Sequence, residues 1–184
     1  MADALTDAGS TTSPNETTYT PPTTSWGITD DFEEDKDHGF RNTSVPEAGS
    51  LFLIQSVATG EIIDLDKGKV ILSPIRGTET KRWLCTESKG QLGFQDPKSG
   101  LFLGYDENEE LCCMVRKQNL WEYFSIRPRP EGGYLLLMCH YNSWLTVLWS
   151  ELRPVGLKGE GESQRLAVIT DRNSGSTVWQ FIKV

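Results

Sequence analysis

The sequence lacks most of the features that mark catalysis, metal binding or membrane insertion. Only two of its 184 residues are histidines, and His140 is the one that lies beyond the first 50 residues. The four cysteines have no C-x-x-C spacing that would suit zinc, and no G-x-S-x-G, Walker or G-x-G-x-x-G motif occurs. No apolar run approaches the ~18 residues of a membrane-spanning helix. We therefore expect no enzyme, no metal, no cofactor and no membrane partner.

An excess of positive charge is also missing. The formal net charge is −8, and residues 1–50, with ten acids and two bases, account for all of it. Residues 51–184 balance 16 acids against 16 bases. Because binding to a phosphate backbone needs a one-sided basic surface, we expect no nucleic acid partner.

The N-terminal part has few large apolar residues. Its first 25 residues are rich in Thr, Ser and Pro, so they cannot bury enough surface to offset their ordering entropy, and they do not resemble a secretory signal. We expect residues 1–45 to be a disordered acidic extension and residues 46–184 to be a single domain. We also expect the protein to be cytoplasmic or nuclear, where its cysteines stay reduced.

The second part of the chain contains a pattern that recurs three times. KSGLFLGYD at 98–106 aligns with ATGEIIDLD at 58–66 and with HYNSWLTVL at 140–148, at intervals of 40 and 42 residues. In each copy a turn-forming residue, Gly60, Gly100 or Asn142, precedes large apolar residues. Such fixed-interval similarity indicates a repeat architecture.

A tryptophan that opens a strand-like run follows each turn. Trp83, Trp121 and Trp179 come 23, 21 and 37 residues after their turns, and each alternates with another apolar residue. We expect all three tryptophans in the core. The larger third distance predicts an insertion at about 150–164, which is polar and glycine-rich.

Twelve short apolar runs, four in each unit, predict an all-β domain. Three units of four strands, with the repeated turn and the closing W-x-apolar strand, resemble the β-trefoil superfamily over residues 49–184, and most of all its fascin-like and ricin-B-like members. The resemblance implies a six-stranded barrel capped at one end by three hairpins.

The same resemblance implies several functions. A ricin-B-like protein would be a lectin, but the Q-x-W signature is absent, since Lys81, Asn119 and Thr177 stand two residues before the tryptophans. A fascin-like protein would bind actin, and a trefoil protease inhibitor would use a reactive loop such as the 150–164 insertion. We interpret the chain as a monomeric, non-catalytic binding module for an unidentified protein partner, with carbohydrate as the alternative.

The third unit breaks the pattern in a way that suggests a site. Trp149 stands where the other units have Lys67 and Glu107. One interpretation is that His140, Tyr141 and Trp149 form an exposed aromatic patch for a ligand or partner. The other is that Trp149 folds back and anchors the insertion.

A second candidate lies in the acidic extension. Trp26 and Phe32 stand among acids in residues 25–42 and either contact a partner or pack on the domain.

Limited digestion with trypsin, followed by mass spectrometry, distinguishes these two interpretations of the acidic extension. A docked segment resists cleavage at Lys36 and Arg41, whereas an undocked one is cut there while the domain remains whole.

Overall fold

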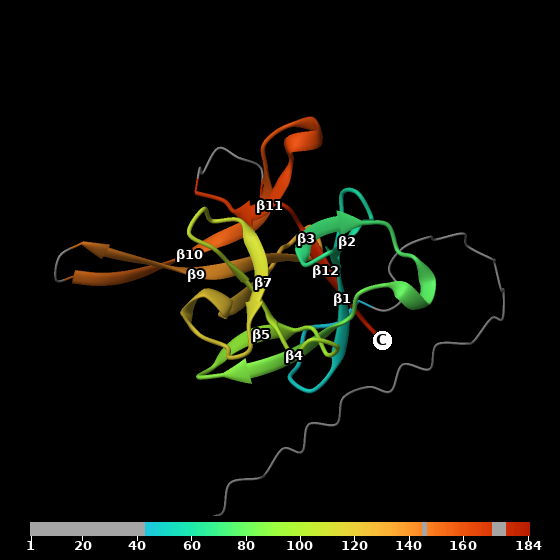
Figure 1. The fold of residues 1–184 in the computed structure, drawn as a ribbon, viewed down its shortest axis with the longest axis horizontal. Coiled ribbons are helices and arrows are strands. Elements are labelled where there is room, and N and C mark those ends of the chain that lie inside the picture. Colours follow the sequence, from blue (N-terminus) through green and yellow to red (C-terminus); the bar gives the residue numbers. More distant parts are fainter. Residues whose placement is uncertain (1–42, 145–146, 171–175) are drawn as a thin grey trace, which may run out of the picture. The chain divides into compact units, whose positions relative to one another are not determined.

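The computed structural model describes residues 43–144, 147–170 and 176–184, with the backbone alone for residues 79, 141–144, 147–149 and 162. This part of the chain consists of strands and short 3-10 helices, which confirms the predicted all-β class (Figure 1). It contains no helix of the length and apolarity that a membrane span requires. The elements are β1 (Leu51–Ser56), β2 (Ile62–Asp66), β3 (Lys69–Ser73), η1 (Gly77–Glu79), β4 (Trp83–Ser88), β5 (Gln91–Gln95), β6 (Phe102–Tyr105), β7 (Leu111–Val115), η2 (Leu120–Glu122), β8 (Phe124–Pro128), β9 (Tyr134–Trp144), β10 (Val147–Lys158), η3 (Gly161–Ser163), β11 (Arg165–Val168) and β12 (Trp179–Lys183).

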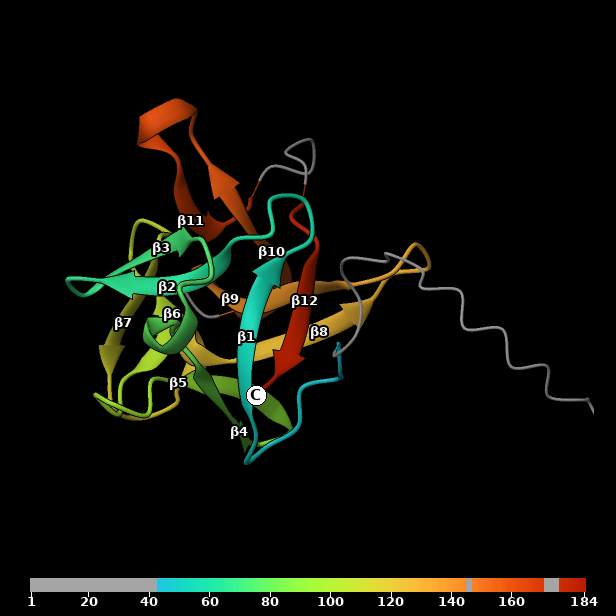
Figure 2. The same ribbon diagram turned by 90° about the vertical axis from the view of Figure 1, so that its right-hand side faces the viewer.

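Six strands pair in a closed ring. β1 pairs with β4, β4 with β5, β5 with β8, β8 with β9, β9 with β12, and β12 again with β1, always antiparallel. The others form the hairpins β2–β3, β6–β7 and β10–β11 (Figure 2). Each predicted unit therefore gives its first and fourth strands to the ring and its second and third to a hairpin. Because the pairings return to β1, the ring has no end strand with an open edge.

The core contains alternate residues of the ring strands together with buried residues of all three hairpins. Phe52, Phe94, Phe124 and Phe181 are fully buried. The ring centroid of Phe94 lies 5.2 Å from that of Phe124 and 5.8 Å from that of Phe181. Since successive side chains of a strand point to opposite faces, alternate residues of a ring strand reach this cluster, as Phe52 and Ile54 of β1 do.

Two buried tryptophans join the ring to the hairpins. Trp83 and Trp179 are fully buried at the starts of β4 and β12. Their indole N–H groups donate to the carbonyl oxygens of Ile63 at 2.9 Å and Val155 at 3.1 Å. The predicted core positions of these two tryptophans are confirmed.

The repeated turn forms in the first two units. Gly60 and Gly100 have φ angles of 72° and 69°, which side-chain-bearing residues rarely adopt. In each turn the carbonyl oxygen of this glycine accepts a hydrogen bond from a glutamine of the preceding strand, Gln55 at 2.5 Å and Gln95 at 2.9 Å. The predicted turns at these glycines are thus confirmed.

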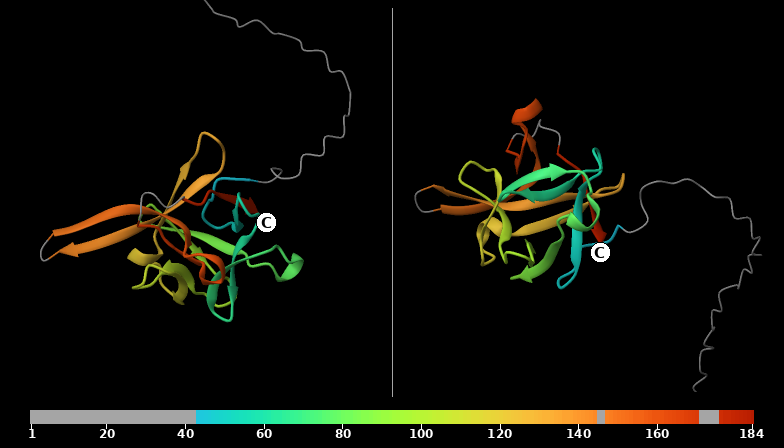
Figure 3. Two further views of the ribbon diagram at one scale, coloured as in Figure 1. Left: turned by 90° about the horizontal axis from the view of Figure 1, so that it is seen from above. Right: turned by 45° about the vertical axis from the view of Figure 1, so that its right-hand side comes forward.

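The predicted third turn, at Asn142, is wrong. β9 continues through this residue, which pairs with Trp149 of β10. The two strands form a ribbon, here called the arm (residues 139–152), that projects from the rest of the domain (Figure 3). The arm sequence has no glycine at the expected turn and is rich in aromatic and β-branched residues, so strand pairing continues. Of the predicted insertion at 150–164, residues 150–158 belong to β10.

The prediction that Trp121 belongs to the core is also wrong. This residue lies in η2, and its side chain is 42% exposed. Trp83 and Trp179 stand two residues before a fully buried residue of a ring strand, whereas Trp121 stands three before Phe124. Glu122 therefore takes the place of the tryptophan in the second unit.

Local contacts explain why Glu122 is accommodated there. Its carboxylate accepts a hydrogen bond from the backbone N–H of Asn119 at 3.0 Å, as in a capping box. Gly104 leaves room for it, because a Cβ at that position would lie 2.9 Å from Glu122 Oε1. Burial raises the pKa of Glu122 despite its backbone hydrogen bonds. With Glu122 turned inward, the preceding Trp121 reaches the surface.

The different placement of the three tryptophans predicts unequal stability losses. Trp83→Ala and Trp179→Ala should each lower the free energy of unfolding by about 3–5 kcal/mol, because each leaves a cavity in the core. Trp121→Ala should cost only about 1 kcal/mol, mainly for a lost ring contact. Urea unfolding of the three variants tests this, and equal losses would contradict the assignment of Trp121 to the surface.

Candidate functional site

The candidate site is a depression where three elements meet. It has a volume of about 420 Å³ and is lined by Tyr105 of β6, the turn 106–109, Trp121 of η2 and His140 at the root of the arm. These residues are separated by up to 35 positions in the sequence, and strand pairing brings them together. The site therefore joins the second unit to the third.

Three stacked rings form the apolar part of the depression. Tyr105 stacks with Trp121 at 5.5 Å and 26°, and with His140 at 5.9 Å and 13°. Tyr105 is 4% exposed, and its hydroxyl donates to the carbonyl oxygen of Cys139 at 3.1 Å. Because Tyr105 is fixed in this way, it supports the half-exposed indole of Trp121 as a rigid platform.

The turn 106–109 is ordered by the carboxylate of Asp106. Asp106 Oδ1 accepts hydrogen bonds from the backbone N–H groups of Asn108 at 2.9 Å and Glu110 at 3.0 Å. Glu109 adopts a φ of 65°, a strained value for a residue with a side chain. The turn presents Glu107 and Asn108 to solvent and directs Glu109 toward the arm.

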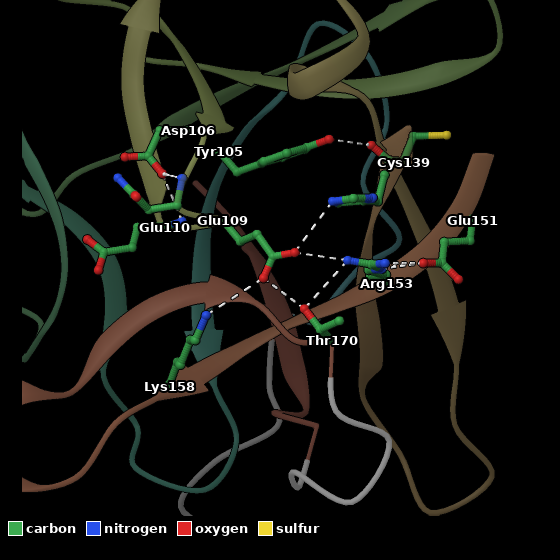
Figure 4. Close-up of polar contacts among 11 residues, drawn as sticks. Tyr105, Asp106, Glu109, Glu110, Cys139, Glu151, Arg153, Lys158 and Thr170 are labelled. Atoms are coloured by element: carbon green, nitrogen blue, oxygen red, sulfur yellow. Dashed lines mark hydrogen bonds and ion pairs between the residues drawn. The ribbon is translucent and has the colours of Figure 1, made fainter. Parts of the chain in front are cut away.

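Glu109 is the centre of a polar cluster that holds the root of the arm (Figure 4). Its Oε1 lies 2.9 Å from an Arg153 guanidinium nitrogen and 3.5 Å from His140 Nε2. Its Oε2 accepts from Thr170 Oγ1 at 2.8 Å and lies 3.7 Å from Lys158 Nζ. These contacts link the turn of the second unit to β9, to β10 and to Thr170, which follows β11, so the cluster joins the root of the arm to the depression.

The cluster also sets the charge state of its members. Partial burial raises the pKa of Glu109, but the Thr170 hydrogen bond and the charges of Arg153, Lys158 and His140 outweigh it and hold that pKa below its ordinary value. Burial and the Arg153 charge lower the pKa of His140, although Glu109 opposes them. His140 is therefore neutral at pH 7 and Glu109 is ionised.

Thiol chemistry is disfavoured at Cys85, Cys112 and Cys113. All four cysteines are free, and burial raises the pKa of Cys85 and Cys112 to about 11 and that of Cys113 to about 12. A thiol with such a pKa is almost entirely protonated at neutral pH and is a poor nucleophile. Among the described residues, no group of three or more His, Cys, Asp or Glu side chains is placed to hold a metal ion.

The residues predicted as a site are found in different places. His140 lines the depression. The backbone of Tyr141 belongs to β9 and that of Trp149 to β10, but their side chains lie outside the described part of the structure, so the aromatic patch stays a prediction. Trp26 and Phe32 lie outside the described residues, so their proposed interactions stay predictions.

Sequence reasoning missed Tyr105 and Trp121 because both fit the repeated apolar pattern. One signal was available. Trp121 follows Gly100 by 21 residues, whereas Trp83 follows Gly60 by 23. This shorter distance marks Trp121 as out of step with the core tryptophan of the first unit.

No protein-family model and no curated protein matches the chain. Among solved structures, it is similar to a GlcNAcα1-4Gal-releasing endo-β-galactosidase from Clostridium perfringens, with a TM-score of 0.53 and 17% identity over 73% of this chain and 32% of that one. It is also similar to a GH43 β-1,3-galactosidase, with a TM-score of 0.55 and 11% identity over 77% of this chain and 28% of that one. The chain thus spans about a third of each of these proteins, and the likeness concerns the fold.

The position of Glu109 predicts a pH-dependent stabilisation. Glu109→Gln should lower the free energy of unfolding at pH 7 by about 1–3 kcal/mol, because it removes a charged hydrogen-bond acceptor from the cluster. Since the folded-state pKa of Glu109 lies below its ordinary value of 4.5, the difference from wild type should be complete above pH 4.5 and shrink as the pH falls through the lowered pKa.

Urea unfolding at several pH values measures this difference, and Glu107→Gln, at an exposed position of the same turn, is the matched control. A loss that is the same for both variants, or that does not change with pH, would contradict the role given to Glu109.

Proposed function

We propose that the domain is a β-trefoil that binds carbohydrate without catalysing a reaction. The trefoil is supported by the ring of six strand pairings and by one hairpin from each of three successive units. The observation that carries the function is the half-exposed indole of Trp121, held on the buried ring of Tyr105 beside polar groups of the turn 106–109.

This combination suits a sugar. The C–H groups on one face of a pyranose ring are weakly positive and stack on the negative face of an aromatic ring. The hydroxyl groups at the edge of the sugar need acceptors and donors, which the exposed side chains of Glu107 and Asn108 provide beside Trp121. Since Tyr105 covers one side of the indole, the open side of Trp121 would take the ligand.

The charges in the depression favour an uncharged sugar. Asp106, Glu107 and Glu109 line it, and His140 is neutral at pH 7. The charge of Arg153 is used by Glu109 and Glu151. A sialylated or sulfated glycan would meet like charges here, so a neutral glycan is the better ligand.

The other units do not repeat this platform. When the aligned strands are superposed, the pair Tyr105 and Trp121 is replaced by Leu65 with Arg82 in the first unit and by Leu157 with Val178 in the third. Neither pair offers stacked aromatic rings. We infer one sugar site per chain.

The solved neighbours suggest which sugar to test first. Two similar proteins with a TM-score above 0.5 are described as galactosidases. Galactose-containing glycans are therefore the first candidates, although sequence analysis alone favoured a protein partner. That second candidate is supported by Leu120 and Trp121, two consecutive side chains that are 44% and 42% exposed.

A glycan array with the full chain tests the proposal. We expect binding to neutral galactose-containing glycans, with one sugar site per chain by calorimetry. Trp121→Ala should weaken binding by about tenfold or more, because a stacked aromatic anchor is lost. Leu120→Ala, a change at the equally exposed neighbouring position, should leave binding intact.

Circular dichroism shows whether each variant is folded. A blank array with folded wild-type protein, or unchanged binding by Trp121→Ala, would reject the proposal. In that case, loss of a captured protein in pull-downs with Trp121→Ala would support the second candidate.

A further inference from the structure

The three hairpins enclose a second cavity, which is larger than the candidate site. It has a volume of about 830 Å³, and its lining comes mainly from β3, β7 and β11, one strand of each hairpin. These three strands contact one another where the hairpins meet (Figure 2). The volume is within the range of ligand pockets, which is roughly 300–1,000 Å³.

One wall of this cavity is an edge of β3. Five consecutive residues, 68–72, line it. Because successive side chains of a strand point to opposite faces, a cavity that touches all of them runs along the backbone of the strand. β3 pairs with β2 on one side, and in the described part of the chain no strand pairs with its other side. The cavity therefore follows an unpaired sheet edge for about 13 Å, the length of four strand residues.

The turn of this hairpin determines which backbone groups face the cavity. Lys67 and Gly68 both have positive φ, 49° and 81°, as in a two-residue type I′ turn. In such a hairpin the residues that flank the turn, Asp66 and Lys69, exchange backbone hydrogen bonds, and bonded and non-bonded pairs alternate from there along the ladder. The second and fourth residues of β3 therefore direct their N–H and C=O groups away from β2.

These two residues are Val70 and Leu72, and their outward backbone groups have no partner. Among the described residues, no hydrogen bond from another segment reaches either of them. The other two hairpins differ, since Glu110 at the start of β7 forms a β-bridge with Ala167 of β11. Two N–H groups and two carbonyl oxygens of β3 are thus free to pair with an added strand.

Much of the remaining lining is apolar. Leu111 of β7, Leu157 of β10 and Leu166 of β11 line the cavity. Met114 of β7 lines it too, and its side chain is 64% exposed. A flexible thioether side chain fits apolar partners of different shapes. Apolar side chains of a bound strand would therefore find contacts here.

The charges of the cavity disfavour a strongly acidic ligand. Three carboxylates and two bases line it, namely Glu61, Asp106, Glu110, Lys69 and Arg165. An acidic segment, the N-terminal extension of this chain included, would meet this excess of negative charge. A peptide of another protein that carries no net negative charge is the better occupant.

We propose that this cavity is a second binding site, in which an extended peptide of a partner protein adds as a strand to the free edge of β3. Its backbone pairs with Val70 and Leu72, and its alternate apolar side chains contact the leucines of the lining. In this mode of recognition, main-chain hydrogen bonds give affinity and side-chain contacts give specificity. The inference does not rest on the sugar site, because Trp121 and His140 line the depression and not this cavity.

A phage-displayed library of random heptapeptides, selected on the full chain, supplies the probe. We expect enriched peptides with apolar residues at alternate positions and no net negative charge. A synthetic copy is titrated by calorimetry into wild type, Leu72→Pro and Trp121→Ala. Leu72→Pro removes an N–H that faces the cavity but no bond to β2, so it should keep the hairpin and weaken binding about tenfold. Trp121→Ala should bind the peptide as wild type does.

Hydrogen exchange of the full wild-type chain, followed by NMR, tests the inference without a mutation. On addition of the peptide, the amides of Val70 and Leu72 should exchange at least about tenfold more slowly, because they gain hydrogen bonds. The amides of Lys69 and Ile71, which already bond to β2, are the internal control and should not change.

Four outcomes would overturn the inference. They are a library without enriched peptides, unchanged exchange at Val70 and Leu72 in the bound state, binding that is lost in Trp121→Ala but kept in folded Leu72→Pro, and displacement of the peptide by a synthetic copy of residues 25–42. The third would place the peptide in the depression, and the fourth would assign the edge to the extension of this chain. None of them bears on sugar binding by wild type.

Discussion

The ring of six strands is the constraint on which the other features of the domain depend. β1 lies between β12 and β4, so the first and last strands of the domain are held side by side by backbone hydrogen bonds. Once the ring closes, every second residue of its strands must point inward, and only large apolar side chains such as Phe94 and Phe181 satisfy that interior. The hairpins are then held by their flanking strands and by indole hydrogen bonds such as that of Trp83 to Ile63. Local changes in the hairpins, outside the ring, are tolerated because the ring strands hold the core together.

The candidate site arises where the second unit departs from its siblings. Burying Glu122 in place of a tryptophan requires a glycine at position 104 and a backbone donor at Asn119. The indole that the other units bury is thereby displaced by one residue and reaches the surface as Trp121. Tyr105, which replaces a leucine of the first unit, then supports it. The exposed aromatic residue of the candidate site thus results from a one-residue shift of the tryptophan relative to the other two units, and the core remains closed.

The third unit contributes a different kind of departure. Its first two strands are extended into the arm, and the contacts of Glu109 join the root of the arm to the turn 106–109. The positive φ of Glu109 is a strained backbone conformation that lowers the stability of the fold by about 1–3 kcal/mol. The contacts of Glu109 with Arg153, Thr170 and Lys158 offset that cost. They also keep Glu109 charged, whereas burial and the charge of Arg153 lower the pKa of His140 and keep it neutral, so the cluster contributes to both the geometry and the charge of the depression.

The sequence by itself determined the all-β class, the division into three units, the turns at Gly60 and Gly100 and the core positions of Trp83 and Trp179. These follow from short-range rules, since period-2 alternation and positive-φ glycines act within a few residues. Only the tertiary structure decided that Asn142 lies in a strand and that Trp121 lies on the surface. Both outcomes depend on partners far along the chain, the facing strand of the arm for Asn142 and the space beside Gly104 for Glu122. A repeat predicts the features that its three units share, whereas the candidate site lies where the units differ. Those differences depend on how the side chains and strands of one unit pack against another.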